Sequence, residues 1–213
     1  MGHEAAQSRP RVGILALQGA VQDHEEPLHR LGAASRQVRR PEDLQGLDAL
    51  ILPGGESTVM ANFLHLYGLD RAIREHVRQG MPVLGICAGA ILLCMEVDGR
   101  PGALRLLPAK ARRNAYGRQL ASFTATLDTP AGAFEGIFIR APILEPEPGT
   151  EVLCTHDARA VLLRSGIVVA ATFHPERTGD DRIHAWFLSS IRKHAFLVGQ
   201  ALGEGIQARS PPD

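Results

Sequence analysis

One cysteine stands between two glycines in a segment that could carry nucleophilic chemistry. Cys87 is the centre of Gly85-Ile86-Cys87-Ala88-Gly89, which follows an apolar run expected to form a short buried strand over residues 81–86. Glycines two residues to either side of a nucleophile are typical of a nucleophile elbow, a sharp strand-to-helix turn. A Cβ at either glycine would collide with the neighbouring strand or helix. The alternative interpretation is a buried structural cysteine beside glycines that pack a helix.

The turn would lift the sulfur of Cys87 away from the backbone. The helix that follows would point unpaired N–H groups and the positive end of its dipole at the sulfur, which favours the reactive thiolate. The other two cysteines have no partner at metal-ligand spacing, so no metal site is expected. We expect Cys94 to pack in the core on the helix after the elbow and Cys154 to lie in a strand. Three irregularly spaced cysteines suit reduced thiols in the cytoplasm better than a disulfide framework.

A second candidate site follows the apolar residues 167–173, which are expected to form the last strand. His174-Pro175-Glu176 places a base, a turn-fixing proline and a carboxylate at the end of that strand. His174 could take the proton of a thiol and return it to a leaving amine, while Glu176 orients the imidazole. Taken alone, the segment would more simply be a turn capped by a half-buried histidine. The order cysteine, histidine, glutamate along the chain favours the catalytic interpretation.

A third candidate site is the loop Pro53-Gly54-Gly55-Glu56-Ser57-Thr58, directly after an expected strand at 49–52. Two glycines let backbone N–H groups approach a ligand, and Ser57 or Thr58 could cap the next helix. Ligands of open α/β sheets bind in the crevice at the carboxyl ends of the strands. The alternative is an ordinary strand-to-helix turn. The basic loop 112–119, taken alone, would be a solvated surface turn.

Strands and helices alternate through the first half of the chain, which argues for a parallel sheet covered by helices on both faces. After residue 97 the pattern becomes β-rich and partly antiparallel, with proline-rich connections at 142–148. The expected fold class is therefore α/β, a three-layer α/β/α sandwich with a central, mostly parallel sheet and a smaller antiparallel β portion. Expected strands are 12–17, 34–38, 49–52, 81–86, 104–107, 123–127, 136–139, 151–154, 161–164 and 167–173. The first expected helix ends near residue 31, and Pro27 predicts that this helix starts late or kinks. The other expected helices span 41–47, 59–67, 70–79 and 182–198.

The 213 residues are expected to form a single domain over 11–200, with a disordered tail at 1–10 and a flexible tail at 201–213. Lysine plus arginine and aspartate plus glutamate both number 23, so no net charge recruits nucleic acid or a membrane. No segment resembles a transmembrane span or a signal peptide. His156, His184 and His194 carry no spacing signal and are expected at the surface.

The elbow segment together with Phe173-His174-Pro175-Glu176 resembles the class I, triad-type glutamine amidotransferases, from Val12 to about Lys193. Four further segments resemble, within that class, the glutaminase subunits of pyridoxal phosphate synthase. These segments are Leu17-Gln18-Gly19-Ala20-Val21, Leu52-Pro53-Gly54-Gly55-Glu56-Ser57-Thr58, Arg113-Asn114-Ala115-Tyr116-Gly117-Arg118-Gln119 and Phe138-Ile139-Arg140-Ala141-Pro142. The resemblance implies a flavodoxin-like arrangement of the sheet and no cofactor.

The resemblance also implies roles for individual residues in the hydrolysis of L-glutamine. Cys87 would attack the carboxamide, His174 would move the proton and Glu176 would position His174. The backbone N–H groups of Gly55 and Ala88 would form the oxyanion hole. The residues implied in glutamine binding are Gly55, Glu56, Ser57, Arg113, Ile139 and Arg140.

The family further implies a hetero-oligomeric complex. Ammonia would pass to a separate barrel-shaped synthase subunit that makes pyridoxal phosphate, and Gln18 would lie where docking of that partner is felt. Five positions carry residues that are unusual in the family, so the resemblance defines the partner surface and residues 100–110 less closely. They are Ile86, Ala90, Arg105, Pro108 and Arg177.

Two alternative functions stay open on the sequence. The same triad could serve another ammonia acceptor, as in histidine synthesis. The chain could instead be a non-catalytic module of this fold, with the elbow cysteine as an oxidation sensor.

Overall fold

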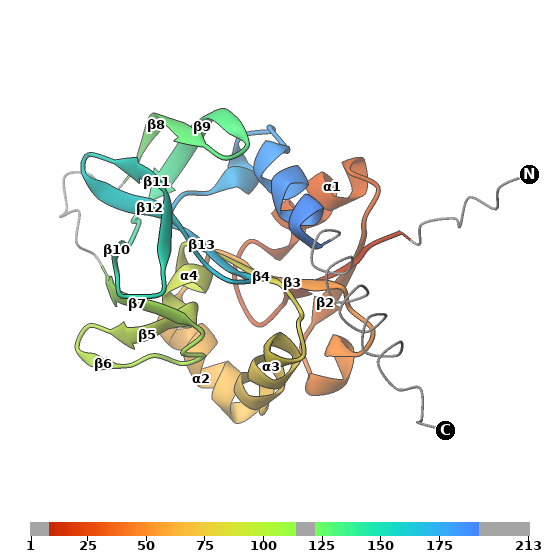
Figure 1. The fold of residues 1–213 in the computed structure, drawn as a ribbon. Helices are drawn as coiled ribbons and strands as arrows, with labels where there is room; N and C mark the ends of the chain where they lie inside the picture. The colour runs from red at the N-terminus through yellow and green to blue at the C-terminus, as the bar shows by residue number, and fades with distance from the viewer. Residues whose placement is uncertain (1–8, 114–121, 192–213) are drawn as a thin grey trace, which may run out of the picture.

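The computed structural model describes residues 9–113 and 122–191 of the chain (Figure 1). Its main sheet begins with five strands in the order β2 (Ala34–Val38), β1 (Arg11–Leu15), β3 (Ala49–Leu52), β4 (Val83–Ile86) and β13 (Val168–Ala171). Each neighbouring pair in this half is parallel. The carboxyl ends of β3, β4 and β13 therefore meet at one edge of the sheet, where the three candidate segments follow them.

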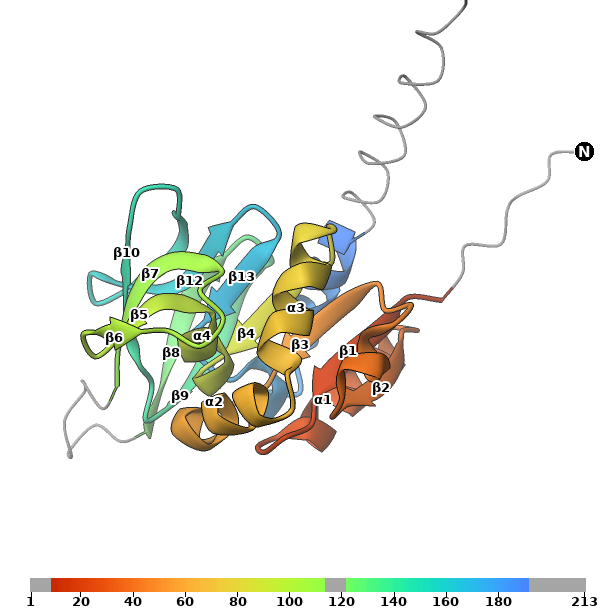
Figure 2. The same ribbon diagram turned by 90° about the horizontal axis from the view of Figure 1, so that it is seen from below.

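Helices cover both faces of the parallel strands. On one face lie the 3₁₀ helix η1 (Pro41–Leu44) and the helices α2 (Ser57–Leu66), α3 (Leu69–Arg78) and α4 (Ala88–Leu93). On the other face lie α1 (Val21–Arg30) and the helical residues 182–191 (Figures 1 and 2). Alternate residues of β3 serve the two faces: Leu50 and Leu52 pack against the first set, and Ile51 packs against the second. The expected three-layer fold is confirmed.

The sheet continues beyond β13 with strands that are mostly antiparallel to their neighbours. The order runs through β12 (Arg159–Ser165), β10 (Ile143–Pro146), β7 (Leu107–Arg112), β5 (Cys94–Val97) and β6 (Arg100–Pro101), and β11 (Glu151–His156) pairs with β12. A separate hairpin is formed by β8 (Ser122–Thr129) and β9 (Gly132–Ile139). This hairpin contributes Phe134 and Phe138 to the core cluster that also contains Leu28 of α1 and Phe187 of the last described helix. The antiparallel portion expected in the second half is thus present.

Several boundaries differ from the sequence-based expectations. The strand expected at 104–107 starts only at Leu107, and Cys94 begins strand β5 instead of lying on the helix after the elbow. Helix α4 ends there because the backbone of Cys94 is already extended, with ψ 151°. The proline-rich stretch 142–148 contains strand β10, in which Pro146 occupies only the last position.

Pro27 lies inside helix α1, which begins at Val21 and so does not start late. A proline there removes one backbone donor, and the helix is held instead by burial of Pro27 and Leu28 and by a C-terminal turn. Gly32, with φ +75°, provides a left-handed residue after that turn, and its N–H donates to the carbonyl of His29.

None of the helices in the described residues is long and apolar enough to cross a membrane. Several predicted features lie outside the described residues. They are the tail at 201–213, His194, the end of the helix expected to reach residue 198, and all but the last two residues of the tail at 1–10. The single-domain assignment over 11–200 stays a prediction.

Candidate active site

Cys87 occupies the turn between β4 and α4 in a strained backbone conformation, with φ 48° and ψ −101°. The turn needs glycine at both flanks. A Cβ on Gly85 would lie 2.7 Å from the carbonyl oxygen of Gly89, and a Cβ on Gly89 would overlap the carbonyl oxygen of Leu52 in β3. The N–H of Cys87 donates to the carbonyl of Ala171 at 2.8 Å, which ties the turn to the end of β13. The strained turn and tight glycine flanks expected of an elbow are therefore present.

His174 and Glu176 follow β13 and form a buried pair. The imidazole Nδ1 lies 2.7 Å from Oε1 of Glu176, and the carboxylate side chain has no exposed surface. Burial acts to lower the pKa of His174, but its interactions with Cys87 and Glu176 outweigh burial and raise that pKa to about 9. Burial acts to raise the pKa of Glu176, but the hydrogen bond from His174 and the electrostatic interactions with His24 and His174 together outweigh burial and lower that pKa. The pair is thus arranged to hold a proton on the imidazole beside Cys87.

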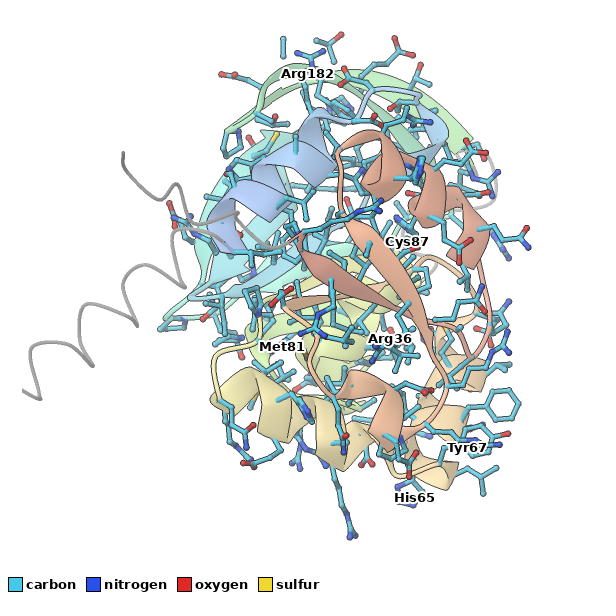
Figure 3. All side chains as sticks on the ribbon, turned by 90° about the vertical axis from the view of Figure 1, so that its right-hand side faces the viewer. Arg36, His65, Tyr67, Met81, Cys87 and Arg182 are labelled. Carbon is cyan, nitrogen blue, oxygen red and sulfur yellow. The ribbon has the colours of Figure 1, made fainter. Side chains whose placement is uncertain are left out.

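A glycine of the loop after β3 makes room for the imidazole. A Cβ on Gly54 would stand 2.5 Å from Cε1 of His174, so only glycine allows this approach without a shift. Figure 3 shows Cys87 near the middle of the molecule, between Arg182 at one end and His65 and Tyr67 at the other.

The three candidate segments line one cavity of about 680 Å³. It contains all the residues implied in chemistry, glutamine binding and partner sensing except Glu176, which lies buried behind His174. Those lining residues are Gln18, Gly55, Glu56, Ser57, Cys87, Ala88, Arg113, Ile139, Arg140 and His174. The thiol of Cys87 is also 3.8 Å from the carbonyl oxygen of Ile139, to which it can donate. A volume of this size accommodates an amino acid substrate.

Charged and polar groups at the rim are held by specific contacts. The Nε of Arg113 donates to Asp98 at 2.6 Å, and its Nη1 donates to the hydroxyl of Thr58 at 2.7 Å. The N–H of Glu56 donates to Oε1 of Gln18 at 2.6 Å, so Gln18 is tied directly to the glycine loop.

The cap of α2 is the carboxylate of Glu56, which accepts from the N–H groups of Thr58 and Val59. The expectation that Ser57 or Thr58 caps this helix is therefore wrong.

Comparison with known proteins identifies the family to which this arrangement belongs. The model of the SNO glutamine amidotransferase family matches residues 14–193. The chain belongs to the SNO glutamine amidotransferase family. Two curated relatives, from Roseiflexus castenholzii and Thermus thermophilus, are named pyridoxal 5'-phosphate synthase subunit PdxT, and each is 47% identical to the chain. The alignments cover 83% of the chain and 98% and 95% of those relatives.

Solved structures agree with this family assignment. A crystal structure of a glutamine amidotransferase is 45% identical, covers 84% of this chain and 98% of its own, and superposes with a TM-score of 0.81. The structure of PurLQS from Thermotoga maritima is 19% identical and covers 86% of this chain and 99% of its own. Its TM-score of 0.63 shows a shared fold. The arrangement of sheet and helices that brings the candidate residues together is therefore found in other solved proteins.

The structure also brings to the site residues to which the sequence assigned no part in substrate binding. Asp98 and Thr58 hold Arg113, and Arg177 lines the cavity while it pairs with Asp23 at 3.0 Å. No group of three or more His, Cys, Asp or Glu side chains within residues 9–113 and 122–191 is arranged to hold a metal ion.

One sequence-based placement is clearly wrong: His184 is fully buried and not at the surface. Its ring contacts that of His24, which is also fully buried. Nε2 of His24 in turn lies 3.9 Å from Oε2 of Glu176. The signal was present in the sequence, because His184 has the spacing of Phe187, Leu188 and Ile191 on the apolar face of its helix.

Proposed function

We propose that this amidotransferase hydrolyses L-glutamine to glutamate and ammonia through a thioester on Cys87. The observation that carries the proposal is that the elbow cysteine and His174 line one cavity, with Glu176 hydrogen-bonded to His174 from behind. A thiolate beside an imidazolium is the form in which cysteine attacks a carbonyl carbon most readily. The oxidation-sensor alternative does not require a buried histidine–glutamate pair beside the cysteine.

The reaction divides into two steps that use the same imidazole. The thiolate of Cys87 adds to the carboxamide carbon, and the C–N bond breaks as His174 gives its proton to the leaving nitrogen, which departs as ammonia. His174 then takes a proton from water, whose oxygen attacks the thioester and releases glutamate and the thiolate. Glu176 accepts the Nδ1–H throughout, so the imidazole keeps one orientation.

Backbone N–H groups of Gly55 and Ala88 would stabilise the oxyanion that forms in each step. Each such donor is typically worth about 2.7–4 kcal/mol of transition-state stabilisation. The glutamine α-carboxylate would be held by Arg113, since a planar guanidinium matches a carboxylate. Glu56, Ser57, Ile139 and Arg140 line the same cavity and complete the proposed substrate site.

The names of the curated relatives extend the proposal to a partner. They are subunits of pyridoxal 5'-phosphate synthase. We therefore propose that the ammonia is delivered to a barrel-shaped synthase subunit in a hetero-oligomer. Gln18 would sense docking of that partner, because its side chain is hydrogen-bonded to the glycine loop that carries Gly55. Three free thiols fit the reducing cytoplasm as the compartment.

The test is glutamate release by the chain with and without a synthase subunit. Cys87→Ala should abolish release, because no other nucleophile is proposed to form the thioester, while the fold and the complex remain intact. Cys94→Ala is the matched control: burial raises the pKa of the Cys94 thiol to about 12, so this variant should keep its activity.

A glutamine analogue with a reactive diazo ketone should label Cys87 and spare Cys94 and Cys154. Substantial glutamate release by the Cys87→Ala variant would reject the covalent mechanism.

A further inference from the structure

Two fully buried histidines lie directly behind the candidate triad, and the proposed reaction does not use them. His24 comes from α1 and His184 from the last described helix, 160 residues further along the chain. Their rings are in contact, with Nδ1 of His24 3.0 Å from Nε2 of His184. Burying a polar ring costs free energy unless its nitrogens find hydrogen-bond partners. These two rings satisfy one nitrogen each by their mutual contact, and Nε2 of His24 and Nδ1 of His184 are left without a partner among the described residues.

The second ring nitrogen of His24, Nε2, points toward Glu176. This nitrogen lies 3.9 Å from Oε2 of Glu176, the carboxylate oxygen that His174 does not use. Both atoms are buried, and neither has a hydrogen-bond partner among the described residues. The distance is longer than a hydrogen bond, and a movement of about 1 Å would make one. Contacts of this kind in a catalytic site are often long before substrate binds.

The tautomers of both histidines follow from this arrangement. Burial lowers the pKa of His24 and lowers that of His184 to about 4, so both rings are neutral near pH 7. A neutral ring has one donor nitrogen and one acceptor nitrogen. If Nε2 of His24 is to donate to the carboxylate, its Nδ1 must accept, and the donor must then be Nε2 of His184. Each ring fixes the proton of the next, and the chain of contacts ends on Glu176.

We infer that His24 is a positioning residue for Glu176, and that His184 fixes the tautomer in which His24 can serve. The carboxylate would be held at both oxygens, by His174 and by His24, and could not rotate away from the imidazole as charge moves between Cys87 and His174. This inference rests on the proposed glutaminase function. It adds a second layer of contacts that ties α1 and the last described helix to the catalytic turn.

The experiment compares two amides at position 24 in the complex with the synthase subunit. His24→Gln can place its amide N–H where Nε2 lies, whereas His24→Asn can only reach the position of Nδ1. We expect His24→Asn to lower kcat roughly 10- to 100-fold with KM for glutamine little changed, the size of loss seen when the partner of an orienting group is removed. His24→Gln should restore most of kcat. The two variants should melt at similar temperatures, which separates positioning from folding.

A second pair tests the tautomer from the other helix. His184→Gln keeps a donor toward His24 and should retain kcat, whereas His184→Leu should lower it. Equal kcat for His24→Gln and His24→Asn, whether both are high or both low, would overturn the inference. So would full activity of His184→Leu. These outcomes leave the proposed function standing as long as glutamate release still depends on Cys87, so the two failures can be told apart.

Discussion

Arg113 shows how the site prepares a single side chain for a substrate. Asp98 and Thr58 hold its Nε and Nη1, which leaves Nη2 as the guanidinium nitrogen without a described partner. The hydrogen bond with Arg113 also lowers the pKa of Asp98, so the carboxylate stays charged and keeps the guanidinium in place. A guanidinium group fixed in this way can bind the α-carboxylate of glutamine with little further loss of conformational entropy of the Arg113 side chain.

Arg113→Lys is therefore expected to raise KM for glutamine while kcat changes little. A lysine ammonium is a point charge that cannot hold both neighbours and a carboxylate, and we expect a rise of roughly 10-fold or more. Steady-state glutaminase kinetics in the complex measure the effect. Arg112→Lys is the matched control, since Arg112 pairs with Glu145 at 2.7 Å and does not line the cavity. An unchanged KM for Arg113→Lys would remove this residue from the substrate site.

Most of the proposed site residues could be found from the sequence because their signals are local. The glycines around Cys87, and the histidine and glutamate after a strand, are set by short motifs. Contacts between residues distant in the chain have no such motif, although helical spacing does place His184 on the apolar face of its helix. Asp98 reaches Arg113 across 15 positions and His24 reaches His184 across 160, and only the folded sheet brings them together.

Helix α4 can begin directly after Cys87 only because it packs very closely on the neighbouring strand. Gly89 lies against the carbonyl of Leu52 in β3, and Gly85 lies against the backbone of Gly89. Gly89→Ala should push α4 away from β3, destabilise the protein by about 1–3 kcal/mol and slow labelling of Cys87 by the diazo ketone analogue. Urea unfolding and mass spectrometry of the labelled protein measure both effects.

The control for this change is Gly68→Ala at the start of α3. Unlike Gly89, Gly68 has a positive φ, of +70°, and a Cβ there meets no atom within 4 Å. This variant should lose some stability through backbone strain and label at the wild-type rate. Normal labelling of the Gly89→Ala variant would show that the elbow does not depend on this contact.

The parallel elements were predictable, and the antiparallel ones less so, for a physical reason. Strands β2 and β3 match their expected residues, since each is a short segment bounded by turn residues and its helix packs back on it. The run from Ile91 to Cys94 is apolar throughout, so sequence periodicity does not show where α4 ends and β5 begins. Strand β10 exists because β7 and β12 flank it, which no local pattern reports.

At the scale of the whole molecule, contacts between α1 and the last described helix join the two ends of the fold. Arg30 forms two hydrogen bonds of 2.8 Å with Asp181 at the surface, and His24 meets His184 beneath them. The surface pair is partly exposed and contributes little by itself. The buried histidines matter more for stability, because protonating either one inside the core requires a charge there.

The histidine pair should make stability fall in acid before the carboxylates titrate. The pKa of His184 is lowered from 6.5 to about 4, so between these values the unfolded chain binds more protons than the folded one. The stabilisation is complete above pH 6.5 and is lost as pH falls toward 4, by about 1.4 kcal/mol for each pKa unit. His174, whose pKa is raised to about 9, gains protons in the unfolded chain between about pH 7.5 and 6 and acts in the opposite direction there. Urea unfolding from about pH 6 to 4.5, below that range, should therefore show a free energy of unfolding that decreases steadily. His184→Leu should flatten this dependence, while His65→Gln, at a side chain that is 84% exposed, should retain it. An equal slope in the His184→Leu variant would mean that the pair is already protonated in the folded protein.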